Sequence, residues 1–343
     1  MIQTIAKKPK GILLVNLGTP DSPKTSDVRK YLREFLSDPR VVDINPVGRY
    51  ILVNAIIAPF RSPKSAATYR KVWTEKGSPL MVYGLELKVK LQEKLGPDYR
   101  VGLAMRYQSP SIESALLEMQ AEGIDDIKVI PLFPQYASAT GGSVNEKVME
   151  VVGKWQTIPQ IEFVKSFHRD EKMIESFAEN GKKQGIENFD YFLFSFHGLP
   201  QRQLRKADIS RNHCQGGGDC CKTMVEANKN CYGAQCHDTA KAIAEKLGLP
   251  QDSYSVSFQS RLGNDPWIGP YTSKVLKELA EKGKKRILVF CPAFVADCLE
   301  TIYEIGIEYE EEFREEGGEK LVLVESLNTH PIWVEALAEM AMA

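Results

Sequence analysis

The order of apolar and amphipathic segments predicts an α/β protein made of two similar doubly wound halves, each a parallel sheet covered by helices. Short apolar runs of β type alternate with segments of helical spacing along the chain. The alternation begins again in the second half, and 343 residues are enough for two domains of ordinary size. Such alternation is typical of parallel sheets with helices on both faces.

The first half contains three predicted strands and two predicted helices. The first strand is a continuous apolar run that ends at Gly18-Thr19-Pro20, and the first helix has apolar residues at helical spacing. The second helix begins after Ser109-Pro110. The strands cover residues 11–17, 100–105 and 126–133, and the helices cover residues 26–36 and 111–120.

The second half repeats this pattern. Its predicted strands cover residues 191–196, 254–259, 286–290 and 320–324, and its helices cover residues 238–247, 273–282 and 331–340. A boundary near residues 160–169 gives an N-terminal domain over residues 1–165 and a C-terminal domain over residues 166–343. We expect the last helix, residues 331–340, to pack back on the N-terminal domain.

Composition excludes some classes of function. The chain has 44 Lys and Arg against 45 Asp and Glu, and this balance argues against a nucleic-acid-binding protein. The N-terminus lacks the pattern of a signal peptide and no apolar run is long enough to cross a bilayer, so we expect a cytoplasmic protein. The apolar stretch over residues 50–60 fits an amphipathic core helix, a cover over a bound ligand, or a peripheral membrane contact.

The segments that follow the predicted strands are the candidates for a binding site, because ligands of doubly wound proteins bind beyond the carboxyl ends of the strands. These segments are residues 16–20, 106–107, 134–143, 195–200, 259–267 and 292–300. No GxGxxG motif follows the first strand and the sequence has no Walker A pattern. Dinucleotide and P-loop nucleotide sites are therefore disfavoured.

A row of acidic residues follows the strand over residues 286–290. Steps of three and four place its members on one face of a helix: Asp297, Glu300, Glu304, Glu308 and Glu311. Such carboxylates repel each other, but their oxygens suit a route for a divalent cation. A solvated helix face is the alternative. Because the row follows the apolar run 287–295, we expect Asp297 and Glu300 to be partly buried and residues 308–312 to lie on the surface.

His197 is the strongest single candidate for chemistry. It ends the aromatic-rich strand over residues 191–196 and precedes Gly198, so its ring is expected at the rim of a cleft. A neutral imidazole there can bind a metal or accept a proton. Glu300 follows a later strand of the same half, and parallel strands end at one edge. The spacing leaves open whether the two form a metal site or an acid–base pair.

Five of the seven cysteines fall in one Gly-rich stretch within residues 212–237, which we interpret as an insertion. They are Cys214, Cys220, Cys221, Cys231 and Cys236. A cytosolic chain keeps its thiols reduced, so the cluster predicts a metal site, either zinc or iron–sulfur. Four of the five are needed. Adjacent Cys220 and Cys221 are not expected to bind the same cluster together, so Cys214, Cys231 and Cys236 are the firmer three, and His213 and His237 could substitute. Cys291 and Cys298 are expected to be buried small residues.

Seven segments, in order over nearly the whole chain, resemble the ferrochelatases. The matching segments are LVNLGTPDSP (14–23), SPKSAATYRKVW with GSPL (62–80), AMRYQSPSIESAL (104–116), PLFPQYASATGGS (131–143), FSFHGLPQR (194–202), FQSRLGNDPWIGPYT (258–272) and CPAFVADCLETIYEIGIEY (291–309). The resemblance implies the chelatase fold, two Rossmann-like domains with a porphyrin in the cleft between them. It implies insertion of Fe²⁺ into protoporphyrin IX to form protoheme, the last step of heme biosynthesis.

The resemblance also implies roles for individual residues. His197 matches the active-site histidine of the family and Glu300 the carboxylate opposite it, while Asp297 and Glu304 match the acidic path behind Glu300. Leu17, Tyr107, Trp267 and Phe294 match family residues that form the pocket around the macrocycle. Arg106 and Ser138 match polar groups that contact the propionates or the pocket rim. A structural ion pair is the alternative role of Arg106.

Two departures from the family pattern have consequences. Cys298 stands where some members have a second histidine, so that histidine is not essential here unless the thiol replaces it. The cysteines of the insertion imply a 2Fe–2S cluster held by an internal segment, as in some members.

Three other functions stay open. The first is a ferrochelatase acting on coproporphyrin III, whose branch usually has Tyr at the position of Leu17. The second is a cobalt or nickel chelatase. The third is a non-catalytic porphyrin or heme carrier, which the presence of both His197 and Glu300 disfavours.

Overall fold

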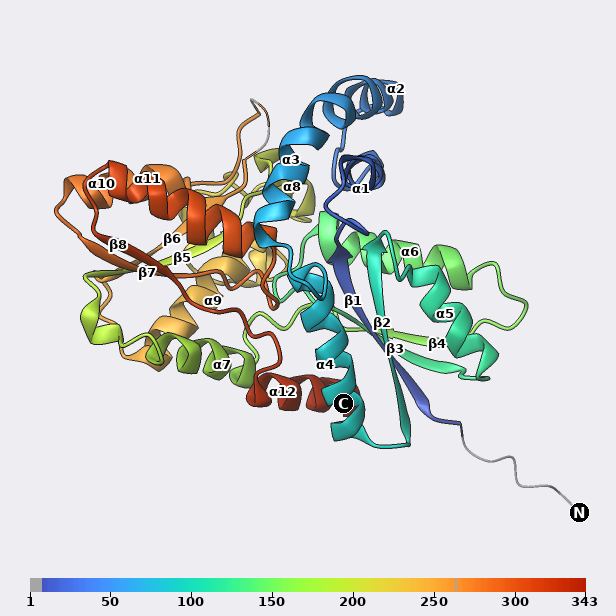
Figure 1. The fold of residues 1–343 in the computed structure, drawn as a ribbon. Coiled ribbons are helices and arrows are strands. Elements are labelled where there is room, and N and C mark those ends of the chain that lie inside the picture. Colours follow the sequence, from blue (N-terminus) through green and yellow to red (C-terminus); the bar gives the residue numbers. More distant parts are fainter. Residues whose placement is uncertain (1–7, 262, 264) are drawn as a thin grey trace, which may run out of the picture.

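Two parallel four-stranded sheets form the centres of the two halves of the chain (Figure 1). A computed structural model describes residues 8–261, 263 and 265–343. Residues 1–7 of the predicted N-terminal domain, and Leu262 and Asn264 of the segment 259–267, lie outside the described residues. The two sheets confirm the predicted α/β class.

The two sheets have the same strand order. The first is β2-β1-β3-β4 and the second is β6-β5-β7-β8, so the layout of the first half is used again in the second. The strands of the first sheet are β1 (Lys10–Gly18), β2 (Tyr99–Tyr107), β3 (Asp126–Pro131) and β4 (Gln160–Phe163). Those of the second are β5 (Tyr191–His197), β6 (Tyr254–Gln259), β7 (Arg286–Phe290) and β8 (Lys320–Leu323).

Burial explains which strands could be predicted. The central strands β1 and β5 are nearly continuous apolar runs, as expected for strands covered on both faces. The short strand β4 was not predicted. It lies at the edge of its sheet, and its sequence QIEF alternates exposed and half-buried residues, so it has no apolar run.

Helices flank both sheets (Figure 1). Those of the first half are α1 (Thr25–Ser37), α2 (Pro46–Ile51), α3 (Ala58–Val72), α4 (Pro79–Leu95), α5 (Ile112–Ala121) and α6 (Ser143–Val152). Those of the second are α7 (Glu171–Lys182), α8 (Gln201–Ala207), α9 (Tyr232–Leu247), α10 (Thr272–Glu281), α11 (Glu310–Glu315) and α12 (Pro331–Met342). Helix α9 begins at Tyr232 instead of residue 238, so Cys236 and His237 belong to a helix and not to an irregular insertion.

Three π-helical segments interrupt this pattern: η1 (Leu52–Ile57), η2 (Ser138–Gly142) and η6 (Leu299–Tyr309). The segment η2 follows β3 and η6 follows β7, which is the equivalent place in the second half. Hydrogen bonds in a π-helix run from residue i to i+5, and such segments are frequent at functional sites. The prediction of one continuous α-helical face from 297 to 311 is therefore wrong, because Asp297 precedes η6 and the turns of η6 are wider.

The two halves share one hydrophobic core. Trp333 of α12 is fully buried, and its ring lies 5.6 Å from that of Phe167, which precedes α7. Helix α12 packs against α4 of the first half and α7 of the second (Figure 1). Lys128 of β3 donates to the carbonyl of Met340 at 3.1 Å and pairs with Glu162. These contacts hold the two sheets next to each other, while the boundary at 165/166 stays a prediction.

Among the described residues, no helix combines the length and apolar character that crossing a membrane requires.

Candidate functional site

His197 lies at the carboxyl end of β5, with its ring half-buried between two aromatic side chains. The centroid of its ring is 6.5 Å from that of Trp267 and 6.4 Å from that of Phe294. Its Nδ1 lies 2.7 Å from the carbonyl oxygen of Gly198. A carbonyl oxygen only accepts, so Nδ1 carries a proton and Nε2 is the nitrogen left to accept a proton or bind a metal.

Gln259 connects the strand of His197 with two of the predicted glutamates. It is the register partner of His197 at the end of β6. Its Nε2 donates to the carbonyl oxygen of Glu300 at 2.8 Å and to the carboxylate of Glu304 at 3.2 Å. The strand pair that carries His197 is therefore bonded to the backbone of Glu300 and to the carboxylate of Glu304, while the pairing of His197 with the Glu300 carboxylate stays a prediction.

Glu304 is held by further donors. The amide of Ser260 donates to it at 2.8 Å, the Ser260 hydroxyl also donates, and the Tyr309 hydroxyl lies at 3.2 Å. Ser260 has a φ of 64°, a left-handed conformation that is unusual for a residue other than Gly. Residues in such conformations cluster at functional sites. This conformation lets the amide and the hydroxyl of Ser260 contact the same carboxylate.

The charge of Glu300 acts on two tyrosines of the N-terminal half that were not predicted. Burial, followed by the negative charge of Glu300, raises the pKa of Tyr31 in α1, and burial raises that of Tyr69 in α3, with Tyr31 and Glu300 contributing. The centroids of the two rings are 6.5 Å apart. Both tyrosines come from helices and not from strand ends, so the rule used to select candidates could not find them.

Asp297 does not join this group. Its carboxylate accepts from Asn328 Nδ2 at 2.8 Å, Thr301 Oγ1 at 3.0 Å and the Ser326 amide at 3.3 Å. Burial raises its pKa, while these hydrogen bonds lower it. Asp297 thus fixes the loop between β8 and α12. Burial was predicted correctly, but the geometry does not support a position in a row with Glu300.

The outer acidic residues Glu308, Glu311 and Glu312 are exposed and follow Glu304 along the chain. Burial and the charge of Glu304 raise the pKa of Glu308, while Lys64 and Lys71 of α3 lower it. Burial and the charge of Glu308 raise the pKa of Glu312. Charge interactions therefore link Glu304, Glu308 and Glu312, and Glu311 also acts on Glu308. Of the predicted row, Asp297 is the member whose contacts place it elsewhere, and the exposure of residues 308, 311 and 312 agrees with the prediction.

Arg106 is part of a buried structural network. Its guanidinium pairs with Asp38 at 2.8 Å and donates to Ser143 Oγ at 2.7 Å, and the Asp38 side chain is 2% exposed. Tyr107 is fully buried, and its hydroxyl donates to Asp38 at 2.9 Å. The interpretation of Tyr107 as a pocket wall does not fit this burial, and the ion-pair alternative for Arg106 is the one that the contacts favour.

The other two predicted pocket residues lie in the first half. Leu17 is half-buried near the end of β1. Ser138 begins η2, and its hydroxyl accepts from Arg40 at 2.9 Å. Arg40 also pairs with Glu146 at 2.6 Å. Arg40 was not predicted, because it follows helix α1 and not a strand.

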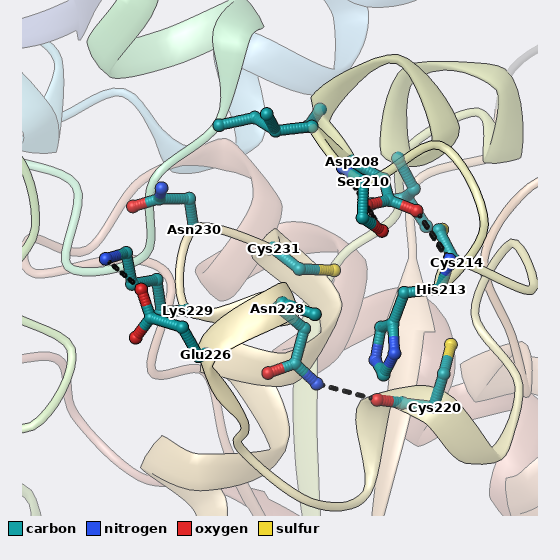
Figure 2. Close-up of a pocket in the computed structure, with 14 residues that line it drawn as sticks. Asp208, Ser210, His213, Cys214, Cys220, Glu226, Asn228, Lys229, Asn230 and Cys231 are labelled. Carbon is teal, nitrogen blue, oxygen red and sulfur yellow. Dashed lines mark hydrogen bonds and ion pairs between the residues drawn. The ribbon is translucent and has the colours of Figure 1, made fainter.

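The cysteine segment (residues 212–231) surrounds a cavity of about 350 Å³, and Figure 2 shows the side chains that line it. Cys214, Cys220 and Cys231 line this cavity together with His213. The sulfur of Cys221 lies 3.9 Å from that of Cys220. The Nε2 of His213 is buried without a hydrogen-bond partner. Three thiols and one unpartnered imidazole thus line the same cavity, and the fourth thiol, that of Cys221, lies next to Cys220.

Backbone and side-chain groups shape this cavity. Asp208 accepts from Ser210 and from the amides of Cys214 and His213, which lowers its pKa to about 2. The amide of Gly216 donates to the sulfur of Cys214 at 3.3 Å. The Cys221 thiol lowers the pKa of Cys231.

Cys236 lies apart from the other four cysteines. It is fully buried in α9 and belongs to the hydrophobic core, where burial raises its pKa. Burial lowers the pKa of His237 to about 4, and its ring packs near Phe258, 6.4 Å away. In the described part of the chain, no three His, Cys, Asp or Glu side chains are already arranged to hold a metal ion.

The Arg106 network gives a direct prediction. Arg106→Ala should lower the free energy of unfolding by about 3 kcal/mol, because it removes the cation from the buried Asp38 carboxylate. Arg100→Ala is the control. It breaks the exposed pair with Glu122 and should cost less than about 1 kcal/mol. Urea unfolding measures both. Wild-type stability of Arg106→Ala combined with a raised KM for a porphyrin would instead identify Arg106 as a substrate anchor.

Comparison with known proteins gives the family. The profile of the Ferrochelatase family matches residues 9–343. The ferrochelatase of Legionella pneumophila (strain Paris) is 44% identical over 328 residues, which cover 96% of this chain and 97% of the relative. That of Coxiella burnetii (strain Dugway 5J108-111) is 46% identical over 334 residues, covering 96% and 92%.

A solved structure, SirB from Bacillus subtilis with Fe³⁺, has the same fold, with a TM-score of 0.52, 14% identity and coverage of 96% of this chain and 93% of that one. The match over nearly the whole length, in both the family profile and the relatives, shows that this chain belongs to the ferrochelatase family.

Proposed function

We propose that this protein inserts Fe²⁺ into protoporphyrin IX, with His197 as the proton acceptor and Glu300 and Glu304 as the carboxylates that supply the iron. Membership of the ferrochelatase family supports metal insertion into a porphyrin as the reaction. The observation that carries the assignment of residues is the hydrogen bond from His197 Nδ1 to the Gly198 carbonyl, which leaves Nε2 as the accepting nitrogen.

The chemistry requires both kinds of group. A free porphyrin carries two pyrrole N–H protons, and these must leave as the metal enters. A neutral imidazole accepts protons near neutral pH. Carboxylate oxygens are suitable ligands for a divalent cation in transit. The position of Glu304, between Glu300 and the outer residues Glu308 and Glu312, supports a route for iron along η6.

Leu17 supports protoporphyrin IX over coproporphyrin III. Coproporphyrin III carries four propionates, whereas protoporphyrin IX carries two propionates and two apolar vinyl groups. Leu17 is half-buried near the end of β1 and offers an apolar side chain without a hydrogen-bonding group. This position favours the more apolar ring.

His197→Ala should lower kcat at least about 100-fold while protoporphyrin IX still binds, because the proton acceptor is lost and the aromatic walls remain. His330→Gln is the control, since His330 pairs with Glu179 away from the site, and it should keep wild-type turnover. Fluorescence follows porphyrin binding and conversion. The wild-type protein should use protoporphyrin IX in competition with coproporphyrin III. The proposal would be contradicted if His197→Ala turned over near the wild-type rate. It would also be contradicted if the wild-type protein preferred coproporphyrin III, or bound protoporphyrin IX without converting it.

We further propose that Cys214, Cys220, Cys221 and Cys231 hold a 2Fe–2S cluster. Cys214, Cys220 and Cys231 line one cavity, and the sulfur of Cys221 lies 3.9 Å from that of Cys220. Amides already donate to the sulfurs of Cys214 and Cys220. Thiolates are the ligands that such clusters require, and the cluster would supply a redox-active iron centre. This set differs from the one expected from the sequence, in which Cys236 is a firm ligand and Cys220 and Cys221 do not both bind. Cys236 is left out because its side chain is fully buried in the hydrophobic core.

The choice of four cysteines can be tested by colour. Cys214→Ser should remove the visible absorption and the acid-labile sulfide, because it deletes a ligand. Cys236→Ala should keep both. A purified wild-type protein that is colourless and contains zinc would overturn the cluster. Loss of the cluster in Cys236→Ala, with retention in Cys214→Ser, would overturn the choice of ligands.

The stretch over residues 50–60 supports a proposal of peripheral membrane contact. Tyr50 is 70% exposed and Phe60 is 79% exposed, and Val47 next to them is 69% exposed. Arg49 and Arg61 are neighbours of this apolar surface. An apolar face flanked by cations is typical of segments that lie on anionic lipid surfaces. Val53 and Ala58 of the same stretch are fully buried, so one face packs in the core and the other carries the exposed apolar side chains.

The double variant Tyr50→Ser/Phe60→Ser should bind vesicles containing phosphatidylglycerol about tenfold more weakly than the wild type, since two apolar side chains no longer enter the lipid. Co-sedimentation measures the bound fraction. Leu85→Ser/Val89→Ser on α4 is the matched control, because these side chains are also exposed, at 47% and 55%. Equal binding by the two double variants, or no binding by the wild type, would refute the membrane contact.

A further inference from the structure

The backbone carbonyl of His197 lies at the end of β5, where the strand pairing of the second sheet ends. Pairing between β5 and β7 ends at Phe194 and Phe290. On the other side, β6 ends at Gln259, and the chain turns away at Ser260 with a φ of 64°. A buried carbonyl without a partner is unfavourable. The partner in this structure is the Tyr232 hydroxyl, which donates to the His197 carbonyl oxygen at 2.8 Å.

The peptide unit between His197 and Gly198 is thereby held at both of its polar groups. The Tyr232 hydroxyl donates to the His197 carbonyl oxygen. The Gly198 amide donates to the Gln259 carbonyl oxygen at 2.8 Å. A methyl group added at Gly198 would lie 3.1 Å from the Trp267 ring, so little free space surrounds this peptide. Because the His197 ring is bound to the Gly198 carbonyl, a shift of this peptide changes the direction of Nε2.

Tyr232 is also the first residue of α9, directly after Cys231. Tyr232 is 7% exposed, and its hydroxyl donates to the His197 carbonyl oxygen. The next residue, Gly233, packs so closely on the cysteine segment that a methyl group there would lie 2.8 Å from the sulfur of Cys221. Gln235 of the same turn donates to the Lys229 carbonyl at 2.8 Å. The first turn of α9 is therefore joined to the cysteine segment on one side and to His197 on the other.

We propose that Tyr232 is a positioning residue that holds the His197 peptide in place and couples the cysteine segment to the candidate active site. This inference rests on the proposed role of His197. A displacement of the segment around Cys221 would move the first turn of α9, and the Tyr232 hydroxyl would transmit that movement to the imidazole.

Tyr232→Phe keeps the buried ring and removes only the hydroxyl. We expect kcat for Fe²⁺ insertion into protoporphyrin IX to fall about tenfold, because a buried carbonyl loses its donor. The KM should stay within about twofold, since Tyr232 does not contact the substrate. Visible absorption and labile sulfide should equal those of the wild type. Tyr254→Phe is the control with wild-type kcat, because its ring packs on Phe194 in the same core, 5.7 Å away.

A thermal midpoint measured for each variant separates positioning from stability. If Tyr232→Phe lowers only the midpoint and keeps wild-type kcat well below it, the residue is merely structural and the inference is wrong. If the wild-type protein is inactive, or His197→Ala keeps its turnover, the proposed function fails instead. The two failures are therefore distinguishable.

The coupling is tested by a double-mutant cycle. Cys221→Ala should lower kcat in the wild-type background, because it removes both a proposed cluster ligand and the sulfur against which Gly233 packs. The same change in the Tyr232→Phe background should have little further effect, since the connection is already broken. Independent, additive losses would overturn the coupling.

Discussion

The buried amide of Gln259 is the interaction on which the candidate site depends. Its side chain is 2% exposed. Its Oε1 accepts from the Ser195 hydroxyl at 2.7 Å, and its Nε2 donates to the carbonyl of Glu300 and the carboxylate of Glu304. A buried amide is costly unless its donors and acceptor find partners. The Gln259 amide therefore has its hydrogen-bond partners only when η6 packs on this edge of the sheet. Gln259 is also the register partner of His197, so the same strand pair positions His197 relative to η6.

The repeated layout explains why the chemistry lies in the second half. In both halves a π-helix follows the third strand in chain order, η2 after β3 and η6 after β7. The short segment η2 carries small residues and Ser138, whereas the longer η6 carries Glu300 and Glu304. One connection thus has two uses: a polar rim in the first half, and an acidic wall opposite the helices α1 and α3 in the second.

The sequence was sufficient to predict which segments lie at the edges of the sheets. It was insufficient to predict which distant residues contact them. The position of η6 at the edge that carries His197 follows from parallel strands alone, because segments after such strands meet at one edge. The burial of Arg106 against Asp38 joins residues that are 68 positions apart. The contact of Asp297 with Asn328 joins residues that are 31 apart. No local sequence pattern predicts contacts between residues so far apart. A π-helix cannot be recognised from the sequence, because its apolar spacing also fits an α-helix.

The position of the cysteine segment in the repeated layout favours a link to the active site. It lies between β5 and β6, and the apolar surface around residues 50–60 lies between β1 and β2, the equivalent connection of the first half. Long crossover connections tolerate insertions at little cost, because they leave the pairing of the strands unchanged. The two connections follow the central strands β1 and β5, whose ends carry the candidate residues Leu17 and His197. An insertion at this place reaches the active site through a single helical turn, and Tyr232 stands in that turn.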